Sequence, residues 1–345
     1  MRKGRRRGAW RGWLIGILVA VPVLWVGYWY AAQEIARAAL DRATTRQVAG
    51  GRFACTGQRL GGFPLRLDFG CTRAAYGDGP EGTGERLSAA LGGIEASAPL
   101  YWPGYVEATL VSPFVINAPF SGIAITTQWS DATTSASAGI DGLTSAAATF
   151  HGLDFSNAGG PVLPVKALTA DFARASASPA GGKAYRFTAT AHALKVVRAD
   201  GREIPAIDGD AEITALDFGN SLGTDPREAL RAWARAGGTA HIDRLRFAAG
   251  NAVADADGQL TIAPNGLLSG TLTVRLRNPE AFVALAEAIK PGASKDASKV
   301  LGVIAALTVP VDTPDGPARQ TTLIIRNGFV AVGILPVGMI PPIRF

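Results

Sequence analysis

An uncharged run near the N-terminus constrains this chain more than any other feature. No charged residue occurs from Gly12 to Gln33, and the central part, Trp13 to Tyr30, is strongly apolar. As a helix, the run would be about 33 Å long, which is enough to cross a hydrocarbon core of about 30 Å. We therefore predict a transmembrane helix at residues 13–32. Pro22 does not argue against it, because proline is tolerated in spanning helices.

Basic residues precede this run and aromatic residues close it. The basic residues are Arg2, Lys3, Arg5, Arg6, Arg7 and Arg11, and the aromatic residues are Trp25, Tyr28, Trp29 and Tyr30. Basic flanks stay in the cytoplasm, and aromatic residues gather at the membrane–water interface. We expect a cytoplasmic segment at residues 1–12, with the chain after about residue 33 outside the cytoplasm.

A cleaved signal peptide is the alternative to an anchor. Cleavage needs a small side chain three residues before the cut bond. Cuts after Ala31 or Ala32 would place Trp29 or Tyr30 there. The sequence therefore favours a retained anchor.

The positive charge of the chain is concentrated before the apolar run. Six of the 34 Lys and Arg residues lie in residues 1–11, which contain no acid, so the remaining 28 basic residues balance the 28 acidic ones. The basic cluster fits contact with anionic lipid at the inner membrane surface. Nucleic acid is not an expected partner, because no basic stripe with interleaved aromatic residues follows.

The two cysteines flank a pattern typical of a β-hairpin. Cys55 and Cys71 enclose a segment with turn signals near residue 63, a spacing that predicts the two sulfurs opposite one another on adjacent strands. In an oxidising compartment a disulfide there would stabilise the fold by about 3 kcal/mol in the chain-entropy model. A redox or metal site is disfavoured, because there is no C-x-x-C motif and no nearby His.

Most of the remaining chain follows the period-two pattern of strands. Helical periodicity continues beyond the apolar run to about Gln47, which predicts a helical stalk at residues 33–48. From Phe53, apolar residues alternate with polar ones, as in a sheet with one apolar face. We predict a mainly β domain at residues 49–345, with two sub-sheets, about 49–200 and 201–345, as one arrangement. Its architecture is a long twisted antiparallel sheet with a groove-like apolar face.

Three amphipathic helices interrupt the strands and are expected on that apolar face. The first begins at Asp225 and Pro226, the second at Asn278 and Pro279, and Ser294 caps the third. The dipeptide Asn327-Gly328 predicts a tight hairpin near the C-terminus. Small residues between about 130 and 195 leave room above the sheet for another layer or for a ligand.

One motif raises the possibility of catalysis. Residues 219–223, Gly-Asn-Ser-Leu-Gly, match a nucleophile elbow, and Asp225 and His241 follow Ser221 in the order of a hydrolase triad. However, an elbow needs a parallel sheet and a helix that begins at the nucleophile, whereas here the helix begins later, at Asp225. We expect no enzymatic activity, no cofactor and no metal site.

Four segments together resemble one bacterial envelope family. They are the anchor, the hairpin that ends in GGFPLRLDFGC at Cys71, the segment from Asp257 to Phe282, and LIIRNGFVAVGILPVGMIPP near the end. These segments look like the family catalogued as domain of unknown function 2125, with wider similarity to AsmA-like and lipid-binding β-groove envelope proteins. The resemblance implies a single-pass protein of the bacterial inner membrane with a periplasmic domain. It implies no activity and no catalytic residues.

The leading hypothesis is that the apolar face holds a lipid acyl chain or docks another envelope protein. The residues expected to line it are Ile123, Ile125, Leu268, Leu272 and Val274. Each of them would also suit an ordinary hydrophobic core. The alternative is a structural or scaffold protein of the envelope that binds no lipid, and a serine hydrolase is the third hypothesis.

Overall fold

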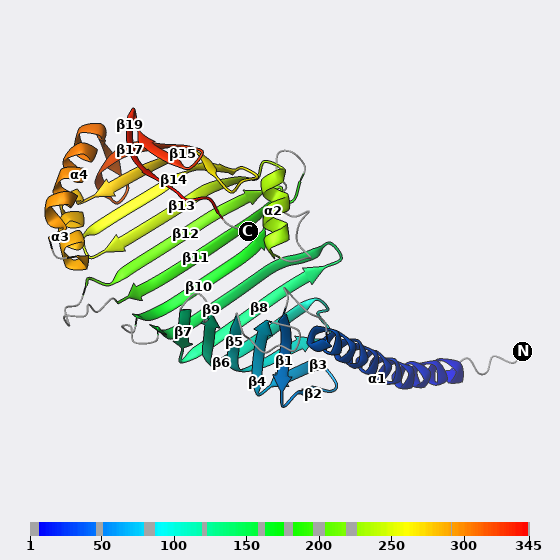
Figure 1. The fold of residues 1–345 in the computed structure, drawn as a ribbon. Coiled ribbons are helices and arrows are strands. Elements are labelled where there is room, and N and C mark those ends of the chain that lie inside the picture. The colour runs from blue at the N-terminus through cyan, green and yellow to red at the C-terminus, as the bar shows by residue number, and fades with distance from the viewer. Residues whose placement is uncertain are drawn as a thin grey trace, which may run out of the picture. The chain divides into compact units, whose positions relative to one another are not determined.

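A computed structural model describes most of the chain. The described residues are 7–45, 51–78, 87–118, 123–157, 163–175, 182–195, 204–218, 226–290 and 292–343, and the side chains of α1 are described from residue 17. The chain forms two compact units, Met1–Val111 with Ile116–Gly122, and Ser112–Val115 with Ile123–Phe345. Figure 1 shows the strands and helices of both.

The first unit begins with the long helix α1, Arg7–Thr45, with Pro22 inside it. This confirms that the helix continues past the apolar run toward the first strand. Among the described residues, no helix is both long enough and apolar enough to cross a membrane.

The strands of the first unit form an antiparallel sheet around β5. Their bounds are β1 (Gly51–Thr56), β2 (Arg59–Gly61), β3 (Arg66–Cys71), β4 (Arg73–Asp78), β5 (Ser88–Pro99) and β6 (Tyr105–Ala118), the last shared with the second unit. One half of β5 pairs with β3 and the other half with β4. β2 pairs with β3, and β1 pairs with β4, so β1–β2 and β3–β4 form one hairpin.

The Cys55–Cys71 disulfide is confirmed, with the two Cα atoms 5.8 Å apart. The register expected from the spacing is wrong, because Cys55 lies opposite Ala74 rather than opposite Cys71. The turn spans residues 62–65 and is closed by a 3.1 Å hydrogen bond from the backbone N–H of Arg66 to the carbonyl of Gly62. The centre of the turn therefore lies after residue 63, the centre expected from the cysteine spacing. Each residue by which the turn centre moves changes the residue opposite a given position by two.

The second unit is built on a long run of antiparallel strands, drawn from teal through green to red in Figure 1. The bounds are β7 (Ile123–Gln128), β8 (Asp131–Gly139), β9 (Gly142–Asn157), β10 (Leu163–Arg174), β11 (Tyr185–Leu194), β12 (Ile207–Leu216), β13 (Thr239–Ala249), β14 (Ala252–Ile262), β15 (Leu268–Arg277), β16 (Val309–Thr313), β17 (Gly316–Arg326), β18 (Phe329–Val332) and β19 (Leu335–Met339). From β9 to β15 each strand pairs with the next along the chain, and β17 pairs with β15. β11 and β12 are neighbours, so strands before and after residue 200 belong to the same sheet.

Three helices accompany this sheet: α2 (Pro226–Arg235), α3 (Pro279–Ile289) and α4 (Ser294–Leu307). Trp233 of α2 packs with Ala215 and Ile262 near one end of the strands. Leu285 of α3 packs with Ala249 and Ala252 near the other end, and α4 lies against α3. The expectation that helices cover the apolar face is confirmed for α2 and α3.

The caps of α3 and α4 differ from those expected. Asn278 makes no side-chain cap bond and instead donates its amide N–H to the carbonyl of Asn251 at 2.9 Å. Ser294 is the first residue of α4 and does not cap it. The carboxylate of Glu287 accepts hydrogen bonds from the backbone N–H groups of Gly292 and Ser294, at 2.9 Å each. A side chain of α3 therefore accepts N–H groups at the start of α4. Asp225 lies outside the described residues.

The hairpin at Asn327-Gly328 is confirmed. Arg326 lies opposite Phe329, and both turn residues have positive φ, 48° for Asn327 and 82° for Gly328. This is the conformation of a two-residue type I′ turn, which matches the natural twist of the two strands.

Candidate functional site on the apolar face of the second unit

Strand register divides the sheet of the second unit into an apolar face and a polar face. Residues directly opposite one another on antiparallel strands share a face. Phe172, Phe187 and Ile213 are joined in this way across β10, β11 and β12, which defines the apolar face. Thr190 and Asp210 are joined across β11 and β12 on the other, polar face.

A row of mostly small residues crosses the apolar face at one register level. Each member lies opposite the next, and the members come in turn from β9 to β15: Ala148, Ala170, Ala189, Ala211, Leu245, Ala256 and Val274. We call these seven residues the alanine row. Ala170 and Ala189 are exposed, and the other members are half-buried. The middle of the apolar face is therefore open to a molecule from outside.

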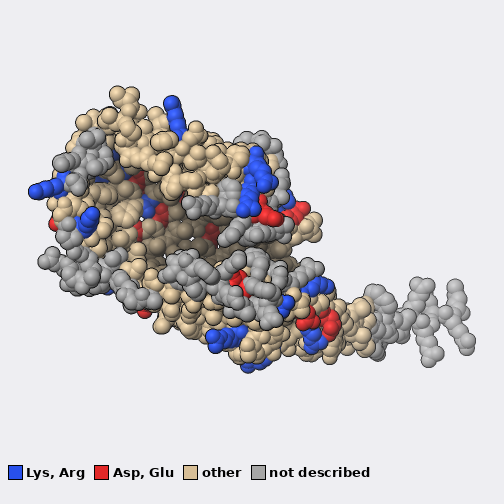
Figure 2. Space-filling view, in the orientation of Figure 1, with Lys and Arg blue, Asp and Glu red and all other residues tan. Residues whose placement is uncertain are grey.

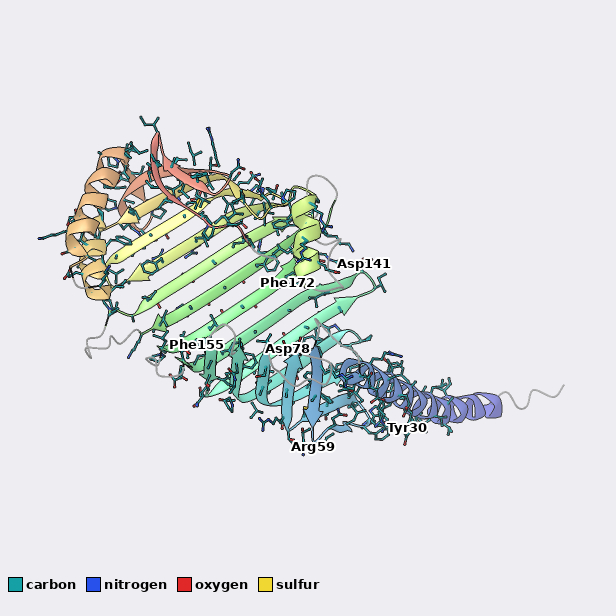
Figure 3. All side chains as sticks on the ribbon, in the orientation of Figure 1. Tyr30, Arg59, Asp78, Asp141, Phe155 and Phe172 are labelled. Atoms are coloured by element: carbon teal, nitrogen blue, oxygen red, sulfur yellow. A yellow bond between two sulfur atoms is a disulfide. The ribbon has the colours of Figure 1, made fainter. Side chains whose placement is uncertain are left out.

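Larger apolar side chains flank the alanine row along both sides. One flank contains Phe172, Phe187, Ile213, Ile242 and Leu272, and the other contains Phe150, Leu168, Phe247 and Leu276. The ring of Phe172, which Figure 3 labels, stacks on that of Tyr185 with centroids 4.7 Å apart and lies 5.1 Å from that of Phe187. Alanine projects less than phenylalanine or leucine, so the alanines of the row lie lower than these large side chains. Neither flank is continuous, because Ala146 and Gly258 lie in the first and Ala191, Gly209 and Ala254 lie in the second.

The helices pack near the two ends of the strands. The indole N–H of Trp233 donates to the carbonyl of Leu216 at 2.7 Å, and the Trp233 ring meets that of Phe218 edge-on at 5.5 Å. At the opposite end, Phe282 and Leu285 of α3 pack with Ile204 and Phe247. No member of the alanine row belongs to either buried cluster of the described residues.

The lining residues expected from the sequence do not all share this face. Val274 belongs to the alanine row, Leu272 flanks it, and Leu268 packs against the cluster around Trp233. Ile125 lies on the polar face. It shares a strand face with Thr127, which lies opposite Phe155 of β9, and Phe155 lies opposite Leu163 of β10. Leu163 and Phe172 are an odd number of residues apart on β10, so they point to opposite faces. The side chain of Ile123 lies outside the described residues.

The polar face carries a network of opposite charges that was not expected from the sequence. Arg277 contacts Asp255 at 2.9 Å and Asp315 at 3.2 Å, and Arg246 contacts the same two carboxylates at 3.5 and 3.1 Å. Arg275 pairs with Asp257 and donates to the side chain of Gln320 at 2.9 Å. The sequence did contain a signal for this network. The acids on β14 and the arginines on β15 each occur at every second residue, which places each pair on one face of its strand.

This network borders a cavity of about 630 Å³ lined by β13, β14, β15 and the β16–β17 turn. The hydrogen bond from Arg246 holds the pKa of Asp315 below its ordinary value, and the charge of Arg277 adds to the effect. Charges of both signs line the cavity, so neither an anion nor a cation is favoured. Figure 2 likewise shows both signs interspersed among uncharged residues on the side in view.

Of the three residues proposed for hydrolysis, only His241 is among the described residues. Ser221 and Asp225 lie outside the described residues. His241 lies on the polar face of β13, opposite Thr214 and Gln259. Within the described part of the chain, no three His, Cys, Asp or Glu side chains are grouped so as to hold a metal ion.

The residues expected at the membrane interface are only partly described. Arg5 and Arg6 lie outside the described residues, and so do the side chains of Arg7 and Arg11. The other three are Trp25, which is half-buried, Trp29, which is buried, and Tyr30, which is exposed.

These features define an antiparallel β protein whose apolar sheet face is packed by helices near the strand ends and open between them. The chain belongs to the family described as "Uncharacterized protein conserved in bacteria (DUF2125)", whose model matches residues 29–341. No curated protein and no solved structure matches the chain. The expected wider similarity to AsmA-like proteins is not shown by these comparisons.

Proposed function

We propose that this protein is anchored in the bacterial inner membrane and holds an apolar lipid chain on the sheet of its periplasmic domain. Residues 13–32 cross the bilayer, residues 1–12 stay in the cytoplasm, and the domain from about residue 49 lies in the periplasm. The function is binding rather than catalysis.

The composition and exposure of α1 support the anchor. Residues 12–33 carry no charge, and the basic cluster lies on one side only. Leu18, Val23 and Leu24 are 74, 64 and 71% exposed, so no other described part of the chain covers them. Large apolar side chains without protein cover are stable in an apolar solvent, which a bilayer provides. The Cys55–Cys71 disulfide fits an oxidising compartment such as the periplasm.

The open alanine row is the observation that carries the lipid proposal. It spans six gaps between neighbouring strands, so it is about 29 Å long at about 4.8 Å a gap. One leaflet of a bilayer is about 15 Å deep, half of the hydrocarbon core, so the row is long enough for an extended acyl chain. A chain there would contact the alanine methyl groups, Leu245 and Val274 below it and, at intervals on both sides, phenylalanine, isoleucine or leucine side chains. Burying each CH₂ group would contribute about 0.8 kcal/mol.

The test is lipid analysis of the full chain after extraction in mild detergent, with two variants of β11. Ala189→Phe fills the exposed middle of the row, whereas Thr188→Phe adds the same ring on the polar face of the same strand. We expect co-purified phospholipid or fatty acid with the native chain and with Thr188→Phe, and several-fold less with Ala189→Phe. Phenylalanine favours strands, so both variants should fold.

Two results would overturn the proposal. One is a native chain that carries no lipid beyond the detergent background, which would favour the alternative of a scaffold for envelope proteins. The other is an equal loss of lipid in both variants, because the apolar face would then have no special role.

A further inference from the structure

The aromatic side chains of α1 are fixed to two loops of the first unit. The indole N–H of Trp25 donates to the carbonyl of Pro64 at 2.7 Å, and that of Trp29 donates to the carbonyl of Arg66 at 3.0 Å. The hydroxyl of Tyr28 donates to the carbonyl of Leu100 at 3.3 Å. The two loops, residues 62–66 and 100–104, thus lie beside the same turns of the helix.

The two loops are also joined to each other and are internally ordered. The backbone N–H of Leu100 donates to the carbonyl of Leu65 at 3.0 Å. The ring of Phe63 meets that of Trp29 edge-on at 5.3 Å, and Trp102 stacks on Tyr105 at 5.0 Å. The geometry of these loops is therefore set by the protein, which reduces the entropy lost on binding a surface.

Four large apolar side chains project from these loops into solvent. Phe63, Leu65, Tyr101 and Trp102 are 56, 57, 70 and 61% exposed, and we call them the loop surface. No acidic residue occurs in residues 62–66 or 100–104, and the single basic residue, Arg66, pairs with Asp68 at 3.0 Å. A neutral surface rich in aromatic residues suits the interfacial layer of a membrane, where Trp and Tyr are enriched.

The position of the loop surface along α1 specifies what it contacts. Most exposed aliphatic side chains of α1, from Ile17 to Leu24, lie on one side of the loop attachments. The ion pair of Glu34 with Arg37 lies on the other side, where Ile35 is also exposed. The helix changes from apolar to charged between Leu24 and Glu34, a rise of about 15 Å. The loops are attached at residues 25–29, in the outer part of the proposed span, among the aromatic residues expected at the membrane–water interface.

We propose that the loop surface docks on the phospholipid bilayer that α1 crosses, with its four side chains in the interfacial layer. This inference rests on the proposed anchor. It adds a second membrane contact, which would hold the first unit against the membrane rather than on a free stalk. The occupant is the lipid surface itself, so no partner protein is needed.

The test measures depth at three single positions of the full chain in vesicles of phosphatidylethanolamine and phosphatidylglycerol. Tyr101→Cys reports the loop surface, Ala20→Cys reports the anchor, and Leu87→Cys is the control at the other end of β5, about 40 Å from Leu100 along that strand. Each introduced thiol carries a polarity-sensitive fluorophore, since the native disulfide occupies both natural cysteines. Nitroxide lipids with shallow or deep labels quench the fluorophore.

We expect the label at position 101 to be quenched by shallow nitroxides several-fold more than the label at position 87. Adding Leu65→Glu and Trp102→Glu to the Tyr101→Cys chain should remove most of that difference. The label at position 20 should be quenched by deep nitroxides.

The outcomes separate the two proposals. Quenching at position 20 with equal quenching at positions 101 and 87 would overturn the loop contact and leave the anchor in place. Quenching at position 101 without quenching at position 20 would support the loop contact and overturn the anchor. No quenching at either position would overturn both.

Discussion

The indole N–H of Trp29 donates a hydrogen bond to the backbone carbonyl of Arg66, with 3.0 Å between nitrogen and oxygen. Trp29 is only 6% exposed, although it belongs to the aromatic group expected at the membrane surface. Its ring packs into the first unit rather than facing outward. The helix α1 is therefore part of the structure of that unit, and we expect the contact of Trp29 to contribute to the stability of the unit.

Trp29→Phe should lower the free energy of unfolding of the full chain in detergent micelles by about 1–2 kcal/mol. Phenylalanine keeps an aromatic ring but loses the five-membered part of the indole, so the carbonyl of Arg66 loses its donor and some buried volume is lost as well. Tyr30→Phe is the matched control, because Tyr30 is 57% exposed and the change keeps its ring. Denaturant titration measures both. Equal stability of Trp29→Phe and the native chain would mean that water replaces the indole donor without cost.

Asp315→Asn should lower the melting temperature at neutral pH and make no difference in acid. Arg246 and Arg277 lower the pKa of Asp315 in the folded protein, so the ionised carboxylate stabilises the fold. That stabilisation is complete above the ordinary carboxyl pKa of about 4 and is lost as the pH falls through the lower folded value. Melting curves of both chains from about pH 8 to about pH 3 test this. A difference that persists at the acidic end would contradict the assignment.

Gly238→Ala should destabilise the contact between α2 and the sheet. A Cβ atom at residue 238 would lie 2.4 to 2.8 Å from three atoms of the Trp233 ring, and this ring is held by its bond to Leu216. Overpacking of this kind costs about 1–3 kcal/mol.

Gly302→Ala is the contrasting variant and should stabilise the protein. Gly302 lies inside α4, and a Cβ atom there would meet nothing within 4 Å. Alanine is favoured over glycine inside a helix by about 0.5–1 kcal/mol. Thermal unfolding of both variants gives the two signs, and the same sign in both would contradict this account of the two glycines.

Replacing both cysteines, Cys55→Ser with Cys71→Ser, should lower the free energy of unfolding by about 3 kcal/mol. The disulfide closes a loop between residues 16 apart in sequence, and without it the unfolded chain gains freedom. Native protein from intact cells should resist alkylation until a reductant is added. Free thiols in that assay would place the domain in a reducing compartment and contradict the periplasmic proposal.

Features that depend on neighbouring residues were predictable from the sequence. Alternation predicted the strands and assigned Leu272 and Val274 to one face, and the Asn327-Gly328 pair predicted the hairpin turn. The starts of α2 and α3 followed from proline at the first helical position. In each case, the deciding contacts lie within a few residues along the chain.

Features that depend on how distant strands are aligned were not predictable. Alternation cannot say which face of a later strand continues the face of an earlier one, so Ile125 was assigned with Leu272 although the register puts them on opposite faces. A turn centre slightly beyond residue 63 was enough to move Cys55 from Cys71 to Ala74. The cap of α4 by Glu287 also joins two elements that local patterns treat separately.

The sequence by itself determined a long N-terminal helix, a β-rich chain with alternating faces, and the partnership of its two cysteines. These depend on local backbone preferences and on there being only two thiols to pair. Only the tertiary structure decided that single alanines from successive strands meet in one row, and that Trp29 is buried against the loop of Arg66. Both are consequences of register and docking, which are set by contacts between residues far apart in the chain.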